Sequence, residues 1–277
     1  MPELPEVEVT RLGLEPHVRG ARISALVVRQ ARLRWPLLAD LGQRLAGQSI
    51  LGLERRAKYL LFHTTAGTLI IHLGMSGSLR LLTQEYPPGA HDHVDLVLEQ
   101  QGQRYWLRFN DPRRFGAMLW QPAGQAILGA PPVLDGLGLE PFDLQCRGAW
   151  LYRHTRTHTA AIKPLLLAGR IVVGVGNIYA SESLFRAGID PRRSARRISE
   201  PRYETLTQAM RSVLQEAIAA GGSSLRDFVN SQGGTGYFQQ AHQVYGRGGQ
   251  PCLRCQRPIR EIRQSQRATW YCPHCQH

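Results

Sequence analysis

Four cysteines near the C-terminal end restrict the possible folds of this chain more than any other feature. Cys252, Cys255, Cys272 and Cys275 follow the spacing C-x2-C-x16-C-x2-C. Each pair forms a knuckle that turns two thiolates to one side, and two knuckles complete the tetrahedral sulfur set that Zn²⁺ prefers. Because four protein ligands leave no position for a catalytic water, the spacing predicts one structural zinc ion. Metal binding then supplies the folding energy that so short a segment lacks.

The residues between the two knuckles predict a basic hairpin. Segment 256–271 holds four arginines and one acidic residue, which are Arg257, Arg260, Arg263, Arg267 and Glu261. A rigid hairpin of this charge suits contact with nucleic-acid phosphates. A zinc ribbon used only for protein contacts is the alternative. The net charge of +13 over 277 residues favours nucleic acid, although charge that only maintains solubility gives the same value.

The first half of the chain predicts an antiparallel β-sandwich or barrel. Val7, Leu14 and Val18 share one face of a helix in the first 20 residues, and a second helix is expected over residues 37–45. Alternation of Val94, Leu96 and Leu98 with polar neighbours indicates a half-buried strand. Short β-rich segments separated by turn residues cover 23–29, 50–56, 59–63, 68–73, 78–82, 94–99, 105–109 and 116–120.

The second half reads as mainly helical. A stretch rich in Gly, Pro and Leu over residues 131–141 indicates a linker. Cys146 after it is expected to be either a small buried hydrophobe or a bystander near the domain junction. No apolar run is long enough to span a membrane, and the acidic N-terminal residues are unlike a secretory leader, so we expect a cytosolic protein. Helices are expected over residues 162–167, 178–187, 203–220 and 224–230.

The N-terminal residues offer a nucleophile. Methionine is normally removed before a small residue, so we expect the mature chain to begin at Pro2 with a secondary amine. An α-amino group titrates near pH ~8, so part of it is neutral at physiological pH. Such an amine can attack a sugar C1′ or an aldehyde to form an iminium ion, with Glu3 beside it as a possible acid. A Pro-Glu that is only the start of a chain is the alternative.

Short motifs in order along the whole chain resemble those of the bacterial formamidopyrimidine-DNA glycosylases. Each motif alone is weak, but the ordered set together with the four cysteines is very specific. The sequence departs from the family over residues 153–160, where Arg and His stand in place of a lysine-rich stretch, so no DNA contact is assigned there. The motifs are PELPEVE at 2–8, RAKYL at 56–60, HLGMSG at 72–77, HDHVD at 91–95, DPRRFG at 111–116, IKP at 162–164, GVGNIYASE at 174–182, GYF at 236–238, VYGR at 244–247 and QRAT at 266–269.

The resemblance implies a multidomain α+β fold. It begins with a helix and an antiparallel β-sandwich, continues with a helical helix-two-turn-helix domain, and ends with a C-terminal four-cysteine zinc finger. On this division, the catalytic sandwich domain covers residues 1–135 and a linker covers 136–149. The DNA-binding helix-two-turn-helix domain covers 150–242 and the zinc finger covers 243–277.

The implied reaction is base-excision repair of double-stranded DNA that contains oxidised purines. The family removes 8-oxoguanine and formamidopyrimidines and then cleaves the strand at the abasic site by β- and δ-elimination. By matched position, Pro2 attacks C1′ and Glu3 protonates the ribose ring oxygen or the base. Lys58 is assigned to proton donation in β-elimination, and Arg267, which grips the flanking phosphates, to δ-elimination. The enzyme is expected to be a monomer in the bacterial cytoplasm or nucleoid.

Seven further residues match DNA-contacting positions of the family. A damaged base must leave the stack, and wedge-shaped side chains fill the hole that remains. The residues matching this intercalating set are Met75, Arg113 and Phe115, and neighbouring glycines predict that they lie on exposed turns. The Gly-rich stretch 223–238 matches the loop that closes over the extruded base. Contacts to the DNA backbone are assigned to His91, Arg114, Lys163 and Asn177.

Two alternatives to this function remain. One is a sibling enzyme on the same fold that prefers oxidised pyrimidines; Leu4 and the intercalating set favour the purine enzyme. The other is a non-catalytic DNA-binding zinc protein, against which the intact Pro2, Glu3 and Lys58 argue.

Overall fold

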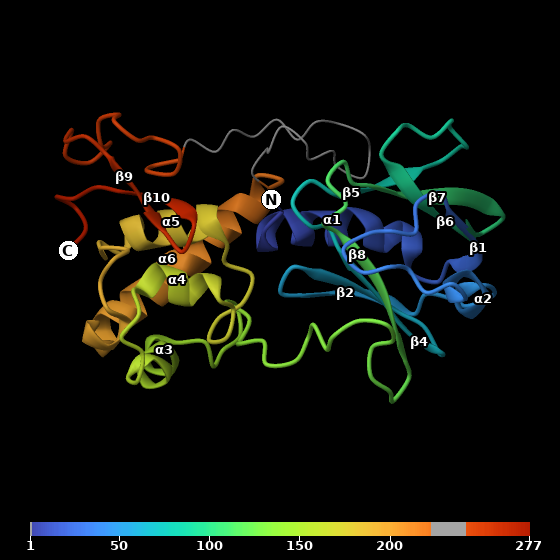
Figure 1. The fold of residues 1–277 in the computed structure, drawn as a ribbon, viewed down its shortest axis with the longest axis horizontal. Helices are drawn as coiled ribbons and strands as arrows, with labels where there is room; N and C mark the ends of the chain where they lie inside the picture. Colours follow the sequence, from blue (N-terminus) through green and yellow to red (C-terminus); the bar gives the residue numbers. More distant parts are fainter. Residues whose placement is uncertain (1, 223–241) are drawn as a thin grey trace. The chain divides into compact units, whose positions relative to one another are not determined.

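The computed structural model describes residues 2–222 and 242–277, and these form two compact units (Figure 1). The first unit comprises residues 2–135 together with 221–222. The second comprises residues 136–220 together with 242–277. None of the helices in these ranges is long and apolar enough to cross a membrane.

The first unit is an antiparallel β-sandwich with a helix at its start, as the sequence predicts. Its two four-stranded sheets have the strand orders β1-β6-β7-β5 and β2-β3-β4-β8. The elements are α1 (Leu4–Val18), β1 (Arg22–Val28), α2 (Leu41–Leu45), β2 (Gly52–Arg56), β3 (Tyr59–His63), β4 (Gly67–His72), β5 (Ser78–Leu82), β6 (Asp92–Gln100), β7 (Gln103–Asn110) and β8 (Ala117–Pro122).

One apolar core joins α1 to both sheets. The predicted stripe of Val7, Leu14 and Val18 is fully buried, and it packs in one cluster with residues such as Phe62 of β3 and Phe109 of β7. Burial of each such side chain stabilises the unit by about 1.5–3 kcal/mol. The core therefore holds the N-terminal end of α1 in a fixed place on the sandwich.

Two details of the prediction are wrong. Only the second half of the expected 37–45 helix is helical. Leu37 lies in an irregular segment, where its N–H donates to Ala31 O at 2.9 Å, and the helix begins at Leu41. Strand β6 is buried on both faces rather than half-buried. Its inward apolar residues alternate as expected, but Asp95 on the other face is also buried because Arg108 donates two hydrogen bonds to it, at 2.9 and 2.8 Å.

The second unit combines helices with a short zinc-finger hairpin. The helices expected over 162–167, 178–187 and 203–220 are confirmed within a few residues, as is the hairpin between the cysteine knuckles. Helix α3 was not predicted, and the helix expected over 224–230 lies outside the described residues. The elements are α3 (Gly148–Thr155), α4 (Ile162–Leu167), α5 (Asn177–Arg186), the 3-10 turn η1 (Ala195–Arg197), α6 (Glu200–Ala219), β9 (Arg260–Gln264) and β10 (Arg267–Tyr271).

Arg211 of α6 fixes the segment that enters the second unit. Its guanidinium donates to the carbonyl oxygens of Pro141, Asp143 and Cys146, at 2.8, 2.8 and 2.9 Å. The side chain of Cys146 is fully buried, as expected, and this burial raises the pKa of its thiol to about 11. Cys146 therefore stays a neutral packing residue, outside the zinc-binding set.

Candidate active site and metal centre

The four C-terminal cysteines are brought together by the hairpin β9-β10 and its flanking knuckles. Their sulfur atoms all lie within 4.8 Å of one another. The Cys252–Cys275 and Cys255–Cys272 sulfur pairs are 3.9 and 3.5 Å apart. A tetrahedral site with Zn–S bonds of ~2.3 Å has sulfur–sulfur edges of about 3.8 Å, so these residues fit one zinc ion.

The backbone of each knuckle also supports the sulfur atoms. Arg254 N–H donates to Cys252 Sγ, and Cys275 N–H donates to Cys272 Sγ, both at 3.4 Å. Hydrogen bonds of this kind stabilise thiolates, which are the form that binds metal. The geometry therefore agrees with a structural zinc ion, with every ligand supplied by protein.

The N-terminal turn buries two carboxylates beside Pro2. Glu3 is the N-cap residue of α1 and is 1% exposed, and Glu6 is fully buried. Glu6 Oε2 accepts a hydrogen bond of 2.7 Å from Glu3 N–H, which belongs to the peptide bond between Pro2 and Glu3. This capping contact fixes the direction in which the Pro2 ring leaves the helix.

Glu6 is a functional candidate that was not predicted from the sequence. Besides holding the Pro2–Glu3 peptide, it lies against Gly222, the last described residue before 223–241. A Cβ atom added at Gly222 would be 3.5 Å from both Cα and Cγ of Glu6. The Glu three residues after the N-cap is the sequence signal that could have indicated it.

The charge of Lys58 acts on His72, which lies on β4. Lys58 precedes β3, in the turn where Ala57 has a φ of +54°, and Tyr59 pairs with His72 of β4. Burial, reinforced by the positive charges of Lys58 and Arg34, lowers the pKa of His72 to about 4. Gly74 N–H donates to His72 Nδ1 at 3.0 Å, so the proton of the neutral ring is on Nε2. Sequence reasoning missed His72, although it opens the HLGMSG motif.

Met75, Arg113 and Phe115 lie on two turns that touch each other. Met75 is in the turn between β4 and β5, and Phe115 is in the turn between β7 and β8. Their side chains are 38% and 45% exposed, so the predicted exposed turns are confirmed. Arg113 Cζ lies 4.9 Å from the centre of the Phe115 ring. A Cβ atom added at Gly74 would be 2.4 Å from Gly116 N, so the two turns are in close contact.

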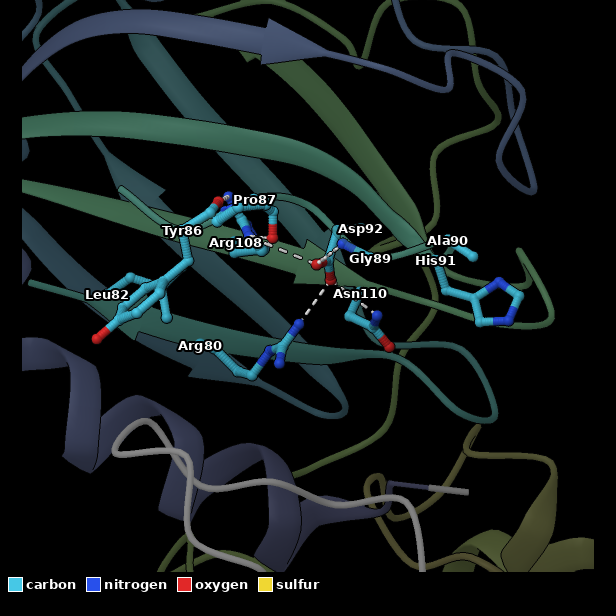
Figure 2. Close-up of a pocket in the computed structure, with 10 residues that line it drawn as sticks. All are labelled: Arg80, Leu82, Tyr86, Pro87, Gly89, Ala90, His91, Asp92, Arg108 and Asn110. Atoms are coloured by element: carbon cyan, nitrogen blue, oxygen red, sulfur yellow. Dashed lines mark hydrogen bonds and ion pairs between the residues drawn. The ribbon is translucent and has the colours of Figure 1, made fainter. Parts of the chain in front are cut away.

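His91 stands at the rim of a pocket that is occupied by ion pairs. Figure 2 shows Arg80 and Arg108 directed toward Asp92, with the His91 ring turned away from this group. The Arg80–Asp92 contact is 2.6 Å, and Asn110 Nδ2 donates to Asp92 Oδ1 at 2.8 Å. The charged side chains inside the pocket are therefore paired with one another. Of the residues that line the pocket, only His91 was predicted to contact DNA. Arg114 is exposed in the turn that also carries Phe115.

Lys163 and Asn177 are bound to the zinc-finger hairpin. Lys163 of α4 is 0% exposed, and its Nζ donates to Ala268 O at 3.2 Å and to Thr269 Oγ1 at 2.8 Å. Asn177 Nδ2, at the start of α5, donates to the same carbonyl at 3.1 Å. Ala268 directly follows the exposed Arg267 on β10. The structure therefore gives both residues a role in holding the hairpin, and their contact with DNA stays a prediction.

Glu182 of α5 is a further residue whose role the sequence did not indicate. Its carboxylate accepts hydrogen bonds from three consecutive backbone N–H groups, those of Gln243, Val244 and Tyr245, at 2.9, 3.0 and 2.8 Å. These residues lie at the beginning of the described chain after 223–241. Glu182 therefore fixes where the zinc finger starts on the helical part of the second unit.

Comparison with protein-family models gives matches along the chain. Residues 1–118 match the formamidopyrimidine-DNA glycosylase N-terminal domain. Residues 137–229 match the formamidopyrimidine-DNA glycosylase H2TH domain. Residues 249–277 match the zinc finger found in FPG and IleRS. The last match, together with the clustered sulfur atoms, identifies the four cysteines as a zinc finger with one zinc site.

Individual relatives agree with these matches over the full chain. A formamidopyrimidine-DNA glycosylase of Cupriavidus pinatubonensis is 58% identical, with 100% of both chains covered. A crystal structure of a Lactococcus lactis Fpg mutant with DNA containing Fapy-dG has a TM-score of 0.86 and 33% identity, over 99% of each chain. A wild-type Lactococcus lactis Fpg complex with DNA containing an oxidised pyrimidine has a TM-score of 0.86 and 34% identity, over 99% of each chain. This chain belongs to the formamidopyrimidine-DNA glycosylase family.

Proposed function

We propose that the protein is a base-excision repair enzyme that removes oxidised purines from double-stranded DNA and then cleaves the damaged strand. The observation that carries this proposal is the N-terminal turn, in which Glu6 holds the Pro2–Glu3 peptide and Glu3 caps α1. A nucleophile and an acid are thus fixed next to each other before substrate binds, and such positioning lowers the entropic cost of reaction.

The glycosylase step uses the amine of Pro2 once Met1 has been removed. The nitrogen forms a bond to C1′ of the damaged nucleotide while the bond from C1′ to the base breaks. As the base leaves and the sugar opens, the base and the ribose ring oxygen each take up a proton. Glu3 supplies one of these protons, and the N–H proton that Pro2 loses on forming the iminium supplies the other. The product is a cationic iminium between Pro2 and C1′.

The lyase steps follow from the iminium, which withdraws electrons from the sugar. The C2′ proton becomes acidic, and its removal expels the 3′ phosphate in β-elimination. Lys58 is proposed as the proton donor of this step. Arg267, at the exposed start of β10, is proposed to bind the flanking phosphates and to promote δ-elimination of the 5′ phosphate.

DNA binding is proposed to use residues of both units. In the first unit, the touching turns present Met75, Arg113 and Phe115 for insertion where the base has left. His91 and Arg114 are proposed to contact the DNA backbone. In the second unit, Lys163 and Asn177 bind the hairpin next to Arg267, and the zinc finger holds that hairpin rigid.

Oxidised purines are proposed as the preferred substrates over oxidised pyrimidines. Leu4 at the start of α1 and the set of Met75, Arg113 and Phe115 favour this preference. The solved Lactococcus lactis complexes include both a Fapy-dG lesion and an oxidised pyrimidine, so the sibling specificity is the second candidate. We also propose that the protein acts as a monomer in the bacterial cytoplasm.

Borohydride trapping on defined duplexes tests the proposal. Reduction of the iminium should yield a covalent protein–DNA adduct with a duplex that contains 8-oxoguanine, and peptide mass spectrometry should locate it at Pro2. An adduct formed only with an oxidised pyrimidine supports the sibling enzyme. Tight binding without any adduct supports a non-catalytic protein. Retention of Met1 in the active enzyme excludes Pro2 as the nucleophile.

The substitution Pro2→Gly separates chemistry from binding. Glycine also permits removal of Met1, but its primary amine gives an imine that must be protonated before it withdraws electrons. A secondary amine gives an iminium that is cationic without a further proton. Base excision should therefore fall by about 100-fold or more, with duplex affinity nearly unchanged. Equal excision rates for the two proteins would contradict the assignment of Pro2.

A further inference from the structure

We propose that Asp111 is a positioning residue that fixes the DNA wedge, defined here as the two turns that carry Met75, Arg113 and Phe115. This inference rests on the proposed function, in which the wedge fills the place of an extruded base. Asp111 is 0% exposed, so its role is exerted through the groups that surround it.

The carboxylate of Asp111 is hydrogen-bonded to both turns of the wedge. Oδ1 accepts a hydrogen bond of 2.9 Å from the hydroxyl of Ser76, the residue after Met75. Oδ2 accepts one of 2.8 Å from Gly116 N–H, directly after Phe115. Arg113 N–H also donates to Oδ1, at 3.3 Å. A single side chain therefore joins the two turns to each other.

The backbone of Asp111 ties the wedge to a third segment. Its N–H donates to His91 O at 3.0 Å, and its carbonyl oxygen accepts a hydrogen bond of 2.8 Å from His93 Nε2. The same carbonyl accepts the N–H of Arg114 at 3.2 Å. Through these bonds Asp111 connects the two turns of the wedge with the segment that carries His91.

The packing around Asp111 indicates that the wedge has one well-defined shape. A Cβ atom added at Gly116 would be 3.0 Å from Asp111 Oδ2 and 2.6 Å from the Phe109 ring, so no larger residue fits between them. Arg114 adopts a φ of +55°, a conformation that side chains other than glycine adopt only when their surroundings impose it. The hydrogen bonds of Asp111 supply that constraint.

A rigid wedge matters because base extrusion is costly. Opening the stack consumes free energy that the inserted side chains must return. Turns that are already ordered lose no further conformational entropy when they enter the DNA. If Asp111 provides this order, its removal must affect reactions on stacked duplex DNA more than reactions on a single strand.

The variant Asp111→Asn tests this distinction. The amide keeps the shape of the side chain, but its NH₂ group faces a backbone donor whichever way it is turned, either Gly116 N–H or Arg113 N–H. Single-turnover excision of 8-oxoguanine from a duplex should slow by at least ~10-fold. Cleavage of a preformed abasic site in a single-stranded oligonucleotide should change by no more than about twofold. The fluorescence rise of 2-aminopurine placed next to the lesion, which reports unstacking, should be reduced in the same proportion as duplex excision.

Two further variants exclude a general loss of stability. Ser76→Ala removes one hydrogen bond and leaves the carboxylate, so it should give a smaller duplex-specific decrease of about threefold. Asp95→Asn changes another buried aspartate of the same sandwich, which pairs with Arg108 outside the wedge. It should lower the melting temperature without altering the ratio of duplex to single-strand rates.

The outcomes distinguish this inference from the proposed function. If the wild-type protein excises 8-oxoguanine but Asp111→Asn lowers the duplex and single-strand rates equally, or neither, Asp111 does not position the wedge. If the wild-type protein excises no oxidised base, the proposed function is wrong, and the role of Asp111 in positioning the wedge is wrong with it.

Discussion

At the scale of single residues, His72 shows how the sandwich sets the charge of a group near Lys58. Its ring packs on Tyr59, with the ring centres 4.8 Å apart, and its Nδ1 accepts the Gly74 N–H. Protonation would remove that acceptor and place a third positive charge near Lys58 and Arg34. The folded protein therefore keeps His72 neutral far below the pH at which a free histidine is protonated.

This lowered pKa predicts a decrease of stability in mild acid. The pKa of His72 is about 4 in the folded state, against an ordinary value of 6.5, so the unfolded chain binds a proton between these pH values that the folded chain does not. Stability is therefore present above pH ~6.5 and lost as the pH falls toward ~4. From pH 7 to pH 5 the contribution of this one group should fall by about 2 kcal/mol.

The variant His72→Asn checks the assignment, because the amide oxygen can replace Nδ1 as acceptor without titrating. Urea unfolding at pH 7 and pH 5 should show a smaller decrease in the free energy of unfolding for this variant than for the wild type. The same replacement at the exposed His158 is the control. An identical pH dependence for His72→Asn and the wild type would contradict the assignment.

At the scale of elements, the sequence predicts the parts whose signals are local. Strands such as β3 and β5 have the expected bounds because their leucine-rich apolar runs end where polar residues begin, and the cysteine spacing alone predicts the hairpin β9-β10. Helix α3, which was missed, has Arg147 as its N-cap residue and no side-chain cap. It is instead fixed by a distant contact, in which Gly148 N–H donates to a carboxylate oxygen of Glu204 at 2.7 Å.

The same distinction applies to the candidate site. Pro2, Glu3 and the cysteines could be proposed from their positions in the sequence, since their chemistry depends on neighbours along the chain. Asp111 and Glu182 could not, because their roles come from hydrogen bonds to residues far away in sequence or to another turn. Lys163 was assigned a contact with the DNA backbone, and only the fold shows that its ammonium is buried against the hairpin.

Lys163 leads to a prediction about the zinc-finger hairpin. The substitution Lys163→Met removes two hydrogen bonds to residues 268–269, one of which goes to the carbonyl directly after Arg267. Bonds from a charged donor contribute about 1.5–3 kcal/mol each, so the start of β10 should become more mobile. Because Arg267 is assigned to δ-elimination, the ratio of δ- to β-elimination products should fall by about threefold or more.

Product analysis on a denaturing gel and amide exchange at residues 268–269 measure this effect together. The matched control is Arg260→Met, which removes a positive charge from the exposed face of β9 without altering the packing against α4. Unchanged products and unchanged exchange in Lys163→Met would show that the buried ammonium does not hold the hairpin.

At the scale of the whole molecule, the sandwich and the zinc finger are stabilised by different means. The first has a large apolar core that includes α1 and both sheets. The zinc finger has a small cluster in which Val244 and Ile259 pack with Phe185 and the cysteines. Structural zinc contributes ~10–16 kcal/mol to folding in comparable peptides, far more than so few apolar side chains provide. Removal of zinc should therefore unfold the finger and leave the sandwich intact.

Removal of zinc should also change how DNA affinity depends on salt. Binding of a phosphate group by a basic side chain releases counterions, so log K falls as log salt rises. The steepness of this fall is reduced by about one for each phosphate group that the protein no longer binds. The exposed Arg267 and Arg263 leave their places when the hairpin unfolds, so Cys252→Ser should weaken binding to any DNA sequence and reduce this slope by about 1–2.

Cys146→Ser is the matched control, because Cys146 is buried outside the zinc set and its change should leave the metal content and the slope unaltered. Binding titrations at several salt concentrations, together with zinc analysis, decide the matter. If the zinc-free variant keeps the wild-type affinity and slope, the finger binds no phosphate groups, and the net charge of +13 acts on DNA through other surfaces.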